Sequence, residues 1–424
     1  MRPLTILLAT WEGGGNVPPV MGAARLLRDA GHRVHILADP VNAPEAHAVG
    51  AGFTPWTTAP ARHDRSPASD PLRDWEEPPG PGGFVRLRDR IMCGPAAAHA
   101  ADTEAAIDAI RPDVIVGSDM LFGVMLAAEA RAIPLALLCP QISLYPLPGL
   151  PPIGMGLTPA RTEADRAVHA DIGAGFGALL DGGLPPVNAA RAARGLAPLP
   201  ALGAQTATAG RILLATSPEF DFPADSLPPP FRYVGPLLHQ PRWAEDRELP
   251  PPGALPRIVV ALSSTFQDQL PTLRAIAAAL SGLNVAATIT RGPALAGAPI
   301  EAGPNVTVLD TAPHDQLMHG AAAVITHAGH GTAIRALTHG VPLLCLPMGR
   351  DQHDIAARVA HHGAGLVLDR AAPAADIRAA VLRLLDEPGF RAQAARLQAK
   401  LADGIADLVA EIESLATPAI CLAA

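Results

Sequence analysis

The sequence has few cysteines, few aromatic residues and no long apolar run. Its four cysteines, Cys93, Cys139, Cys345 and Cys421, lie far apart and include no C-x-x-C pair. This spacing argues against a disulfide framework or a structural zinc site and fits a reducing compartment, so we expect a cytoplasmic protein. A membrane-spanning helix needs about 18 or more consecutive apolar residues. The sequence contains no such run, and we expect no integral membrane segment.

Positive charge is also scarce. The chain has 32 Lys and Arg residues against 40 Asp and Glu residues, a formal net charge of −8, and no basic run. A nucleic acid is therefore not expected as a partner. What the sequence does have is apolar residues, which make up 49 % of 424 positions while charged residues make up 17 %. This length and composition predict two well-buried domains of about 200 residues each.

Short apolar strands alternate with segments of helical apolar spacing along the chain. We expect strands at 5–10, 33–38, 113–117, 135–139, 257–262, 284–290, 306–310, 321–326, 343–346 and 365–368. Helices are expected at 20–30, 84–110, 120–131 and 388–415. Such alternation predicts an α/β fold with doubly wound parallel sheets. Proline-rich segments at 58–83 and 140–160 follow strands, where loops of these folds bind ligands.

The most informative segment is a glycine-bracketed turn after an apolar strand. The strand runs into His327, and Gly329, Gly331 and Thr332 follow before a helix. Glycines leave backbone N–H groups uncovered at a helix N-terminus, whose partial positive charge favours a phosphate. His327 can add a hydrogen bond or a positive charge, and Thr332 can add a hydroxyl group. The segment therefore predicts a phosphate-binding turn.

A second buried strand follows and leads to Asp351 and Gln352. A carboxylate beside an amide is suited to binding sugar hydroxyls, so the two segments together predict a nucleotide-sugar site. The simpler alternative is a solvated helix start, in which Asp351 serves only the helix dipole.

These motifs resemble the donor-binding signature of the UDP-glycosyltransferase superfamily, which has the two-domain GT-B fold, and in particular its bacterial natural-product branch. Three other segments extend the resemblance to nearly the whole chain: Gly31-His32-Arg33-Val34, Tyr233-Val234-Gly235-Pro236-Leu237 and Ala261-Leu262-Ser263-Ser264-Thr265-Phe266. The last of these resembles the family's first phosphate loop, although its hydroxyl residues could also simply cap a helix.

The resemblance implies a set of donor-contacting residues. These are Ser263, Ser264, Thr265, Ala312, His327, Gly329, His330, Gly331, Thr332, Asp351 and Gln352. Among them, Ala312 belongs to the loop whose backbone reads the uracil or thymine base. The family needs no divalent ion, so we expect no metal and no cofactor beyond the donor itself, a UDP- or dTDP-sugar.

The first loop departs from the family pattern Gly-His-x-x-Pro, in which the His is the general base. Here the family proline falls on Pro19, and the catalytic His falls on Asn16. An amide cannot accept a proton near neutral pH. The carboxylate that orients the His in the family falls on Ser118, with Asp119 one residue further. Asn16, Ser118 and Asp119 are therefore the catalytic candidates, unless the register is shifted by one residue.

Three routes remain if the departure is real. In the first, the acceptor is nucleophilic enough to need no base, as an amine, a carboxylate, an acidic phenol or an activated carbon is. In the second, another residue acts as base, and Asp119 and Glu12 are the nearest candidates in the expected fold. Or the protein binds a nucleotide sugar without turnover. A nucleotide-sugar 2-epimerase shares the fold, but the two proline-rich loops favour an acceptor cleft.

Eight histidines lie between residues 314 and 362. Their spacing includes no H-E-x-x-H or facial-triad pattern, and glycine neighbours suit phosphate better than metal.

The resulting prediction is a GT-B enzyme with two Rossmann-like domains facing across a cleft. Residues 1–225 would form the acceptor-binding domain, 226–256 the linker and 257–400 the nucleotide-sugar-binding domain, with 401–424 a helix and tail packing back on the first domain. The expected activity is an inverting transfer of a sugar to a small, mostly apolar acceptor. We expect a monomer or a homodimer.

Overall fold

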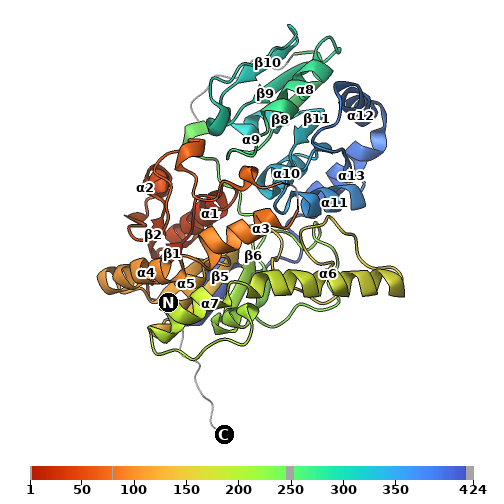
Figure 1. Ribbon diagram of the computed structural model, residues 1–424. Helices are drawn as coiled ribbons and strands as arrows, with labels where there is room; N and C mark the ends of the chain where they lie inside the picture. Colours follow the sequence, from red (N-terminus) through yellow and green to blue (C-terminus); the bar gives the residue numbers. More distant parts are fainter. Residues whose placement is uncertain (1, 79, 245–252, 417–424) are drawn as a thin grey trace.

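The computed structural model describes residues 2–78, 80–244 and 253–416. It contains two parallel β-sheets, each surrounded by helices, with the N-terminal sheet below the C-terminal sheet in Figure 1. The first sheet has seven strands in the order β3-β2-β1-β4-β5-β6-β7. Its strands are β1 (Thr5–Ala9), β2 (Arg33–Ala38), β3 (Gly52–Pro55), β4 (Val114–Ser118), β5 (Leu135–Cys139), β6 (Arg211–Leu214) and β7 (Phe231–Tyr233).

The second sheet has six strands in the order β10-β9-β8-β11-β12-β13. Its strands are β8 (Arg257–Ala261), β9 (Ala286–Thr290), β10 (Val306–Leu309), β11 (Ala323–Thr326), β12 (Leu343–Cys345) and β13 (Gly365–Val367). This pair of sheets confirms the predicted α/β fold of two Rossmann-like domains.

Helices connect the strands within each half. In the first half they are α1 (Val17–Asp29), α2 (Ala43–Ala48), α3 (Gly82–Leu87), α4 (Ala96–Ile110), α5 (Phe122–Ala130), α6 (Glu163–Asp181) and α7 (Leu184–Ala192). In the second they are α8 (Leu270–Leu280), α9 (His314–Met318), α10 (His330–Thr338), α11 (Gln352–His361), α12 (Ala374–Asp386), α13 (Pro388–Gln398) and α14 (Leu408–Ala416).

The central strands form because they are apolar on both faces. In the first sheet Ile6 of β1 pairs with Val34 of β2 and with Val114 of β4, and all three side chains are buried. Helices on both sides of a parallel sheet require this pattern, whereas a half-exposed sheet would alternate polar and apolar residues. The residues that follow these strands are therefore left at one edge of each sheet, free to form a site.

Two predicted helices are each broken in the structure. The segment 84–110 consists of α3, a π-helical turn at Arg88–Met92 and α4. The interruption falls at Gly94, where any Cβ would collide with the carbonyl oxygen of Asp89, and at Pro95 before α4.

The predicted C-terminal helix at 388–415 is likewise two helices, α13 and α14. Gly404 has a φ of 69° between them, a value that a helix does not tolerate. The Asp407 carboxylate then accepts hydrogen bonds from the N–H groups of Val409 at 2.9 Å and Ala410 at 3.3 Å, which starts the second helix. α14 packs against α1 and strands β4, β5 and β6 of the first sheet.

Strand β7 lies inside the range predicted as the linker and pairs with β6, so the first sheet extends to Tyr233. Residues 245–252 of that range, and residues 417–424 of the predicted tail, lie outside the described residues. Within the described part of the chain, no helix combines the length and the apolar character needed to cross a bilayer.

Helix α11 docks the second half onto the segment that follows β6. Arg358 forms an ion pair with the fully buried Asp221 at 2.7 Å, and the hydroxyl group of Tyr233 donates to the same carboxylate at 3.0 Å. On the neighbouring turn, Asp354 accepts hydrogen bonds from the N–H groups of Gly154 at 2.7 Å and Gly156 at 3.0 Å. These contacts fix the relative position of the two halves beside the cleft.

Candidate active site

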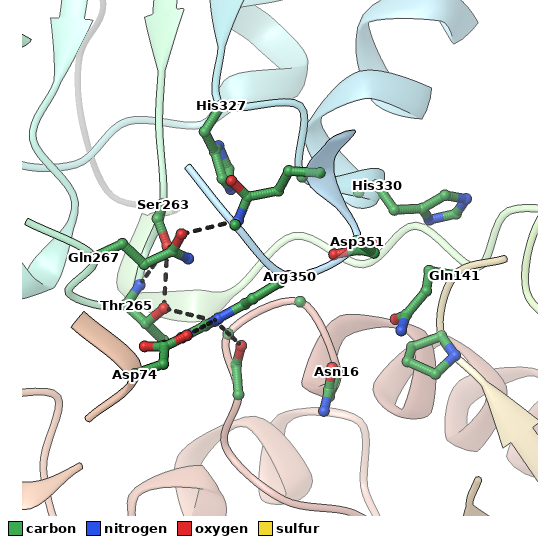
Figure 2. Close-up of a pocket in the computed structure, with 18 of the residues that line it drawn as sticks. Asn16, Asp74, Gln141, Ser263, Thr265, Gln267, His327, His330, Arg350 and Asp351 are labelled. Atoms are coloured by element: carbon green, nitrogen blue, oxygen red, sulfur yellow. Dashed lines mark hydrogen bonds and ion pairs between the residues drawn. The ribbon is translucent and has the colours of Figure 1, made fainter. Parts of the chain in front are cut away.

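A cavity of about 1240 Å³ lies between the two halves. Residues directly after β1, β4 and β5 line it from the first domain, and residues after β8, β11 and β12 line it from the second. Figure 2 shows His327, Ser263, Thr265 and Asp351 on one side of this cavity and Asn16 on the other. The carboxyl ends of both sheets therefore meet in a single site, as expected for open α/β sheets.

The glycine-bracketed turn forms the N-terminus of α10. Gly329 is the N-cap residue, and the helix begins at His330, two residues earlier than expected. The chain turns at Ala328, whose φ of 64° is unusual for a residue with a side chain. A Cβ at Gly329 would lie 2.5 Å from Nε2 of His327, so the imidazole occupies space that only glycine leaves. The N–H of Thr332 donates to the carbonyl oxygen of Gly329 at 3.1 Å, which leaves the N–H groups of His330 and Gly331, two residues that line the cavity, for a ligand.

The two histidines of this turn are neutral at physiological pH. Burial, together with the nearby Arg350 guanidinium, lowers the pKa of His327 to about 3. Burial also lowers the pKa of His330 to about 3, and its Nε2 lies 2.9 Å from the Thr216 hydroxyl. In this state each imidazole offers one N–H donor and no positive charge. The expected positive charge on His327 is therefore absent, while the expected hydrogen bond remains available.

The loop after β8 does not cap a helix. α8 begins only at Leu270, with Gln269 before it, so the capping alternative for Ser263, Ser264 and Thr265 does not hold. The Ser263 hydroxyl instead accepts from the N–H of Thr265 at 3.2 Å. Ser264 faces the first domain, because a Cβ on Gly14 would lie 2.9 Å from its hydroxyl oxygen.

Asp351 precedes α11, but its side chain does not cap that helix. It lines the cavity, and burial raises its pKa to about 6. Gln352 also lines the cavity, but its amide is largely committed to the protein. Its Oε1 accepts from the N–H of Met348 at 2.8 Å, and its Nε2 donates to Gln267 at 2.9 Å. Asp351 is thus the freer of the two residues for a ligand.

Arg350 is a central residue of the site that the sequence reasoning missed. Its guanidinium donates to the Asp74 carboxylate at 2.6 and 3.1 Å, to the carbonyl oxygen of Gly13 at 3.3 Å and to the Thr265 hydroxyl at 3.2 Å. It therefore joins the second domain to two loops of the first (Figure 2). Its φ of 57° is a strained value for a residue with a side chain.

Asn16 lies opposite the donor turn, immediately before α1. It occupies the N-cap position, but its backbone is helical and its side chain makes no capping bond. The side chain is only 8 % exposed, and its Nδ2 has no hydrogen-bond partner among the described residues. Because Nδ2 is enclosed by the protein, a ligand in the cavity would meet the Asn16 amide at its oxygen. Gln141, which the sequence reasoning missed, is a second buried amide in the same cavity and directly follows Pro140 at the end of β5.

Three predicted residues do not line this cavity. Ala312 is buried in the apolar core of the second domain. The Ser118 hydroxyl accepts from the N–H of Met120 at 3.3 Å, and Met120, not Ser118, reaches the cavity. Asp119 is fully buried, and burial raises its pKa to about 7. Neither oxygen of the Asp119 carboxylate has a hydrogen-bond partner of normal geometry in the described part of the chain.

The structure therefore does not place Asp119, one of the two candidate substitute bases, in the cavity. The other candidate, Glu12, lines the cavity, but its carboxylate accepts from the N–H of Gly14 at 2.9 Å and from the Asn42 amide at 2.6 Å. Arg65 lies 3.7 Å away from it. These contacts place Glu12 to hold the glycine loop.

The remaining walls of the cavity are apolar and partly aromatic. Trp75 of the first domain packs edge-on against Phe266 of the second, with ring centroids 5.1 Å apart. Phe84 and Phe176 form a second ring pair at 4.7 Å. No three His, Cys, Asp or Glu side chains of the described residues converge in a way that would hold a metal ion.

Two facing Rossmann-like domains, with a phosphate turn on one and an apolar chamber on the other, define a nucleotide-sugar-dependent glycosyltransferase of the GT-B fold. Comparison with known proteins agrees. Residues 286–412 match the family of erythromycin biosynthesis protein CIII-like C-terminal domains. The chain is 30 % identical over 442 positions to 4'-demethylrebeccamycin synthase of Lentzea aerocolonigenes, covering 97 % of this chain and 99 % of that relative. It therefore belongs to the bacterial natural-product branch of the UDP-glycosyltransferase superfamily.

Other relatives match over shorter or more divergent stretches. Aklavinone 7-beta-L-rhodosaminyltransferase of Streptomyces galilaeus is 32 % identical over 177 residues, which cover 40 % of this chain and 38 % of the relative. The solved glycotransferase of kitacinnamycin has a TM-score of 0.72 at 23 % identity and covers 98 % of this chain and 99 % of its own. Spinosyn rhamnosyltransferase SpnG, solved with thymidine diphosphate, has a TM-score of 0.67 at 20 % identity and covers 98 % of this chain and 100 % of its own. At these identities the solved structures show the shared fold alone.

Proposed function

We propose that this enzyme transfers a sugar from a UDP- or dTDP-sugar to a small, mostly apolar natural-product acceptor, with inversion at the anomeric carbon. The observation that carries the proposal is that one cavity joins the N-terminus of α10 to an apolar chamber lined by Asn16. Relatives named for natural-product glycosylation and a neighbour solved with thymidine diphosphate support it.

In this mechanism the acceptor nucleophile attacks the anomeric carbon from the face opposite the diphosphate. One bond forms between nucleophile and sugar as the bond between sugar and diphosphate breaks, and the nucleoside diphosphate leaves with the bonding electrons. The N–H groups that begin α10 and one N–H of neutral His327 stabilise the negative charge on the leaving diphosphate. No metal ion takes part, because these donors supply the stabilisation. Asp351 binds hydroxyl groups of the sugar.

We further propose that no side chain removes the acceptor proton. Asn16, at the position of the family base, and Gln141 would instead hold the acceptor by hydrogen bonds, since an amide both donates and accepts. A general base is typically worth about 10²–10⁴-fold in rate. Acceptors that already carry a good nucleophile, such as acidic phenols or amines, should therefore be used well, and simple alcohols poorly. The released proton passes to solvent or to the departing diphosphate.

The second candidate function is nucleotide-sugar binding without turnover. The observation that favours it is the absence of the family's base and carboxylate from Asn16 and Ser118. Calorimetry with UDP and dTDP, followed by transfer assays on phenols of graded acidity, separates the two. Binding without transfer to any acceptor would favour the second.

The same assays test the mechanism. Two side chains that line the cavity, Glu12 and His353, are tested as substitute bases with the variants Glu12→Gln and His353→Gln. If either substitution abolishes turnover while nucleotide binding persists, a substitute base exists and the base-free mechanism is wrong. If both retain turnover, and rates rise with the acidity of the phenol, the base-free mechanism is supported.

A further inference from the structure

Helix α6 forms one wall of the acceptor chamber although little of it is buried. Only Leu180 is buried within it, and the helix extends along the side of the first domain (Figure 1). Its start is fixed by a reciprocal cap between Thr162 and Asp165. Four of its residues line the cavity: Ile172, Gly175, Phe176 and Leu179. Their spacing places them on one face of the helix.

Glycines occupy three alternating positions in the middle of this helix, at Gly173, Gly175 and Gly177. Each weakens the helix relative to alanine, because glycine loses more backbone freedom on folding. None of the three has a positive φ, and a Cβ added to any of them would meet no atom within 4 Å. At Gly183, by contrast, a Cβ would lie 2.5 Å from Sγ of Cys93. Neither backbone conformation nor close packing thus requires glycine in α6.

Gly175 differs from Gly173 and Gly177 because it lines the cavity, and a Cβ there would meet only open space. We propose that Gly175 determines acceptor size, because its missing side chain keeps open the part of the chamber beside the Phe84 and Phe176 rings. The acceptors that fit would be apolar small molecules with several rings rather than one, with the nucleophile directed toward Asn16. Asn16 lines the same cavity as Gly175. This inference rests on the proposed transferase function.

The test compares a four-ring phenol, 1-hydroxypyrene, with a one-ring phenol, 4-nitrophenol. Binding of 1-hydroxypyrene is measured by its fluorescence, and transfer from UDP- and dTDP-glucose is measured for both phenols. Gly175→Leu should weaken 1-hydroxypyrene binding by about tenfold or more, the usual penalty for overfilling a packed space. Transfer to 4-nitrophenol and affinity for UDP should stay unchanged, and Gly175→Ala should fall between wild type and Gly175→Leu.

The matched control is Gly173→Leu, which adds the same side chain to the same helix at a position that does not line the cavity. Both leucine variants should unfold at a higher temperature than wild type, because leucine favours the helix. Equal losses for the two phenols, the same loss in Gly173→Leu, or no binding of 1-hydroxypyrene to wild type would overturn the inference. If binding follows Gly175 but no acceptor receives a sugar, the proposed transferase function fails and the size-determining role of Gly175 stands.

Discussion

The buried carboxylate of Asp119 gives the sharpest prediction about stability. Its pKa rises from 3.8 to about 7 because burial disfavours the charged form. Each pKa unit corresponds to about 1.4 kcal/mol, so ionisation of Asp119 lowers the free energy of unfolding by at most roughly 4 kcal/mol. The folded state holds the proton between pH 4 and 7 while the unfolded state releases it, so the free energy of unfolding falls across that window. Above about pH 7 the decrease in the free energy of unfolding is complete.

Asp119→Asn removes this titration and leaves a side chain of similar shape. We expect the variant to be more stable than wild type at pH 8 by up to a few kcal/mol, and to differ little at pH 4. Chemical unfolding at several pH values measures the difference directly. Because Asp39 and Asp351 also have raised pKa values, the wild-type curve alone is not diagnostic; the difference curve isolates Asp119. A pH-independent difference, or a loss of transferase turnover in Asp119→Asn, would refute the reasoning.

Three other experiments test the site. His327→Ala should weaken UDP or dTDP binding by roughly 1–3 kcal/mol, and because His327 is already neutral, the loss should be the same at pH 6 and pH 8; unchanged affinity would contradict the assignment. Arg350→Ala and Asp74→Asn should show a coupling of roughly 0.5–3 kcal/mol in a double-mutant cycle of unfolding free energies, and strict additivity would show that their contact contributes nothing. Asn16→Ala should cost transfer only modestly, whereas Asn16→His should extend it toward weakly acidic alcohols; a flat response of kcat/KM to acceptor acidity in wild type would count against a base-free site.

The fold was largely readable from the sequence because buried parallel strands are continuous apolar runs. β5 has the predicted bounds, and β8, β9 and β10 differ from them by one or two residues. Strand β7 was missed because it is only three residues long and follows a run of prolines. The two breaks were missed because the helical spacing of apolar residues continues across Gly94 and Gly404, although the helical backbone is interrupted there.

The donor side was more readable than the acceptor side for a physical reason. A phosphate turn is local: His327, Gly329 and His330 are placed by one strand end and one helix start. Arg350 is different, because its partner Asp74 is 276 positions away, and no local pattern reveals such a contact. Asp119 shows why positions at the end of a strand are hard to assign from sequence. A shift of one residue there decides whether a side chain lies in the cavity or in the core.

The polar side chains His327, His330 and Asn16, on the two sides of the cleft, are all neutral near pH 7. This shared property is compatible with a site that works without the family's base. On the donor side His327 and His330 are neutral, so stabilisation of the leaving diphosphate comes from N–H groups already in place, and it does not vary with pH near neutrality. On the acceptor side Asn16 is neutral at every pH. Asp351, which we propose binds the sugar, has a pKa of about 6 and therefore titrates near neutrality. Under the base-free proposal, any rise of rate above pH 7 should therefore come from the acceptor's own ionisation, and it should move when the phenol is changed.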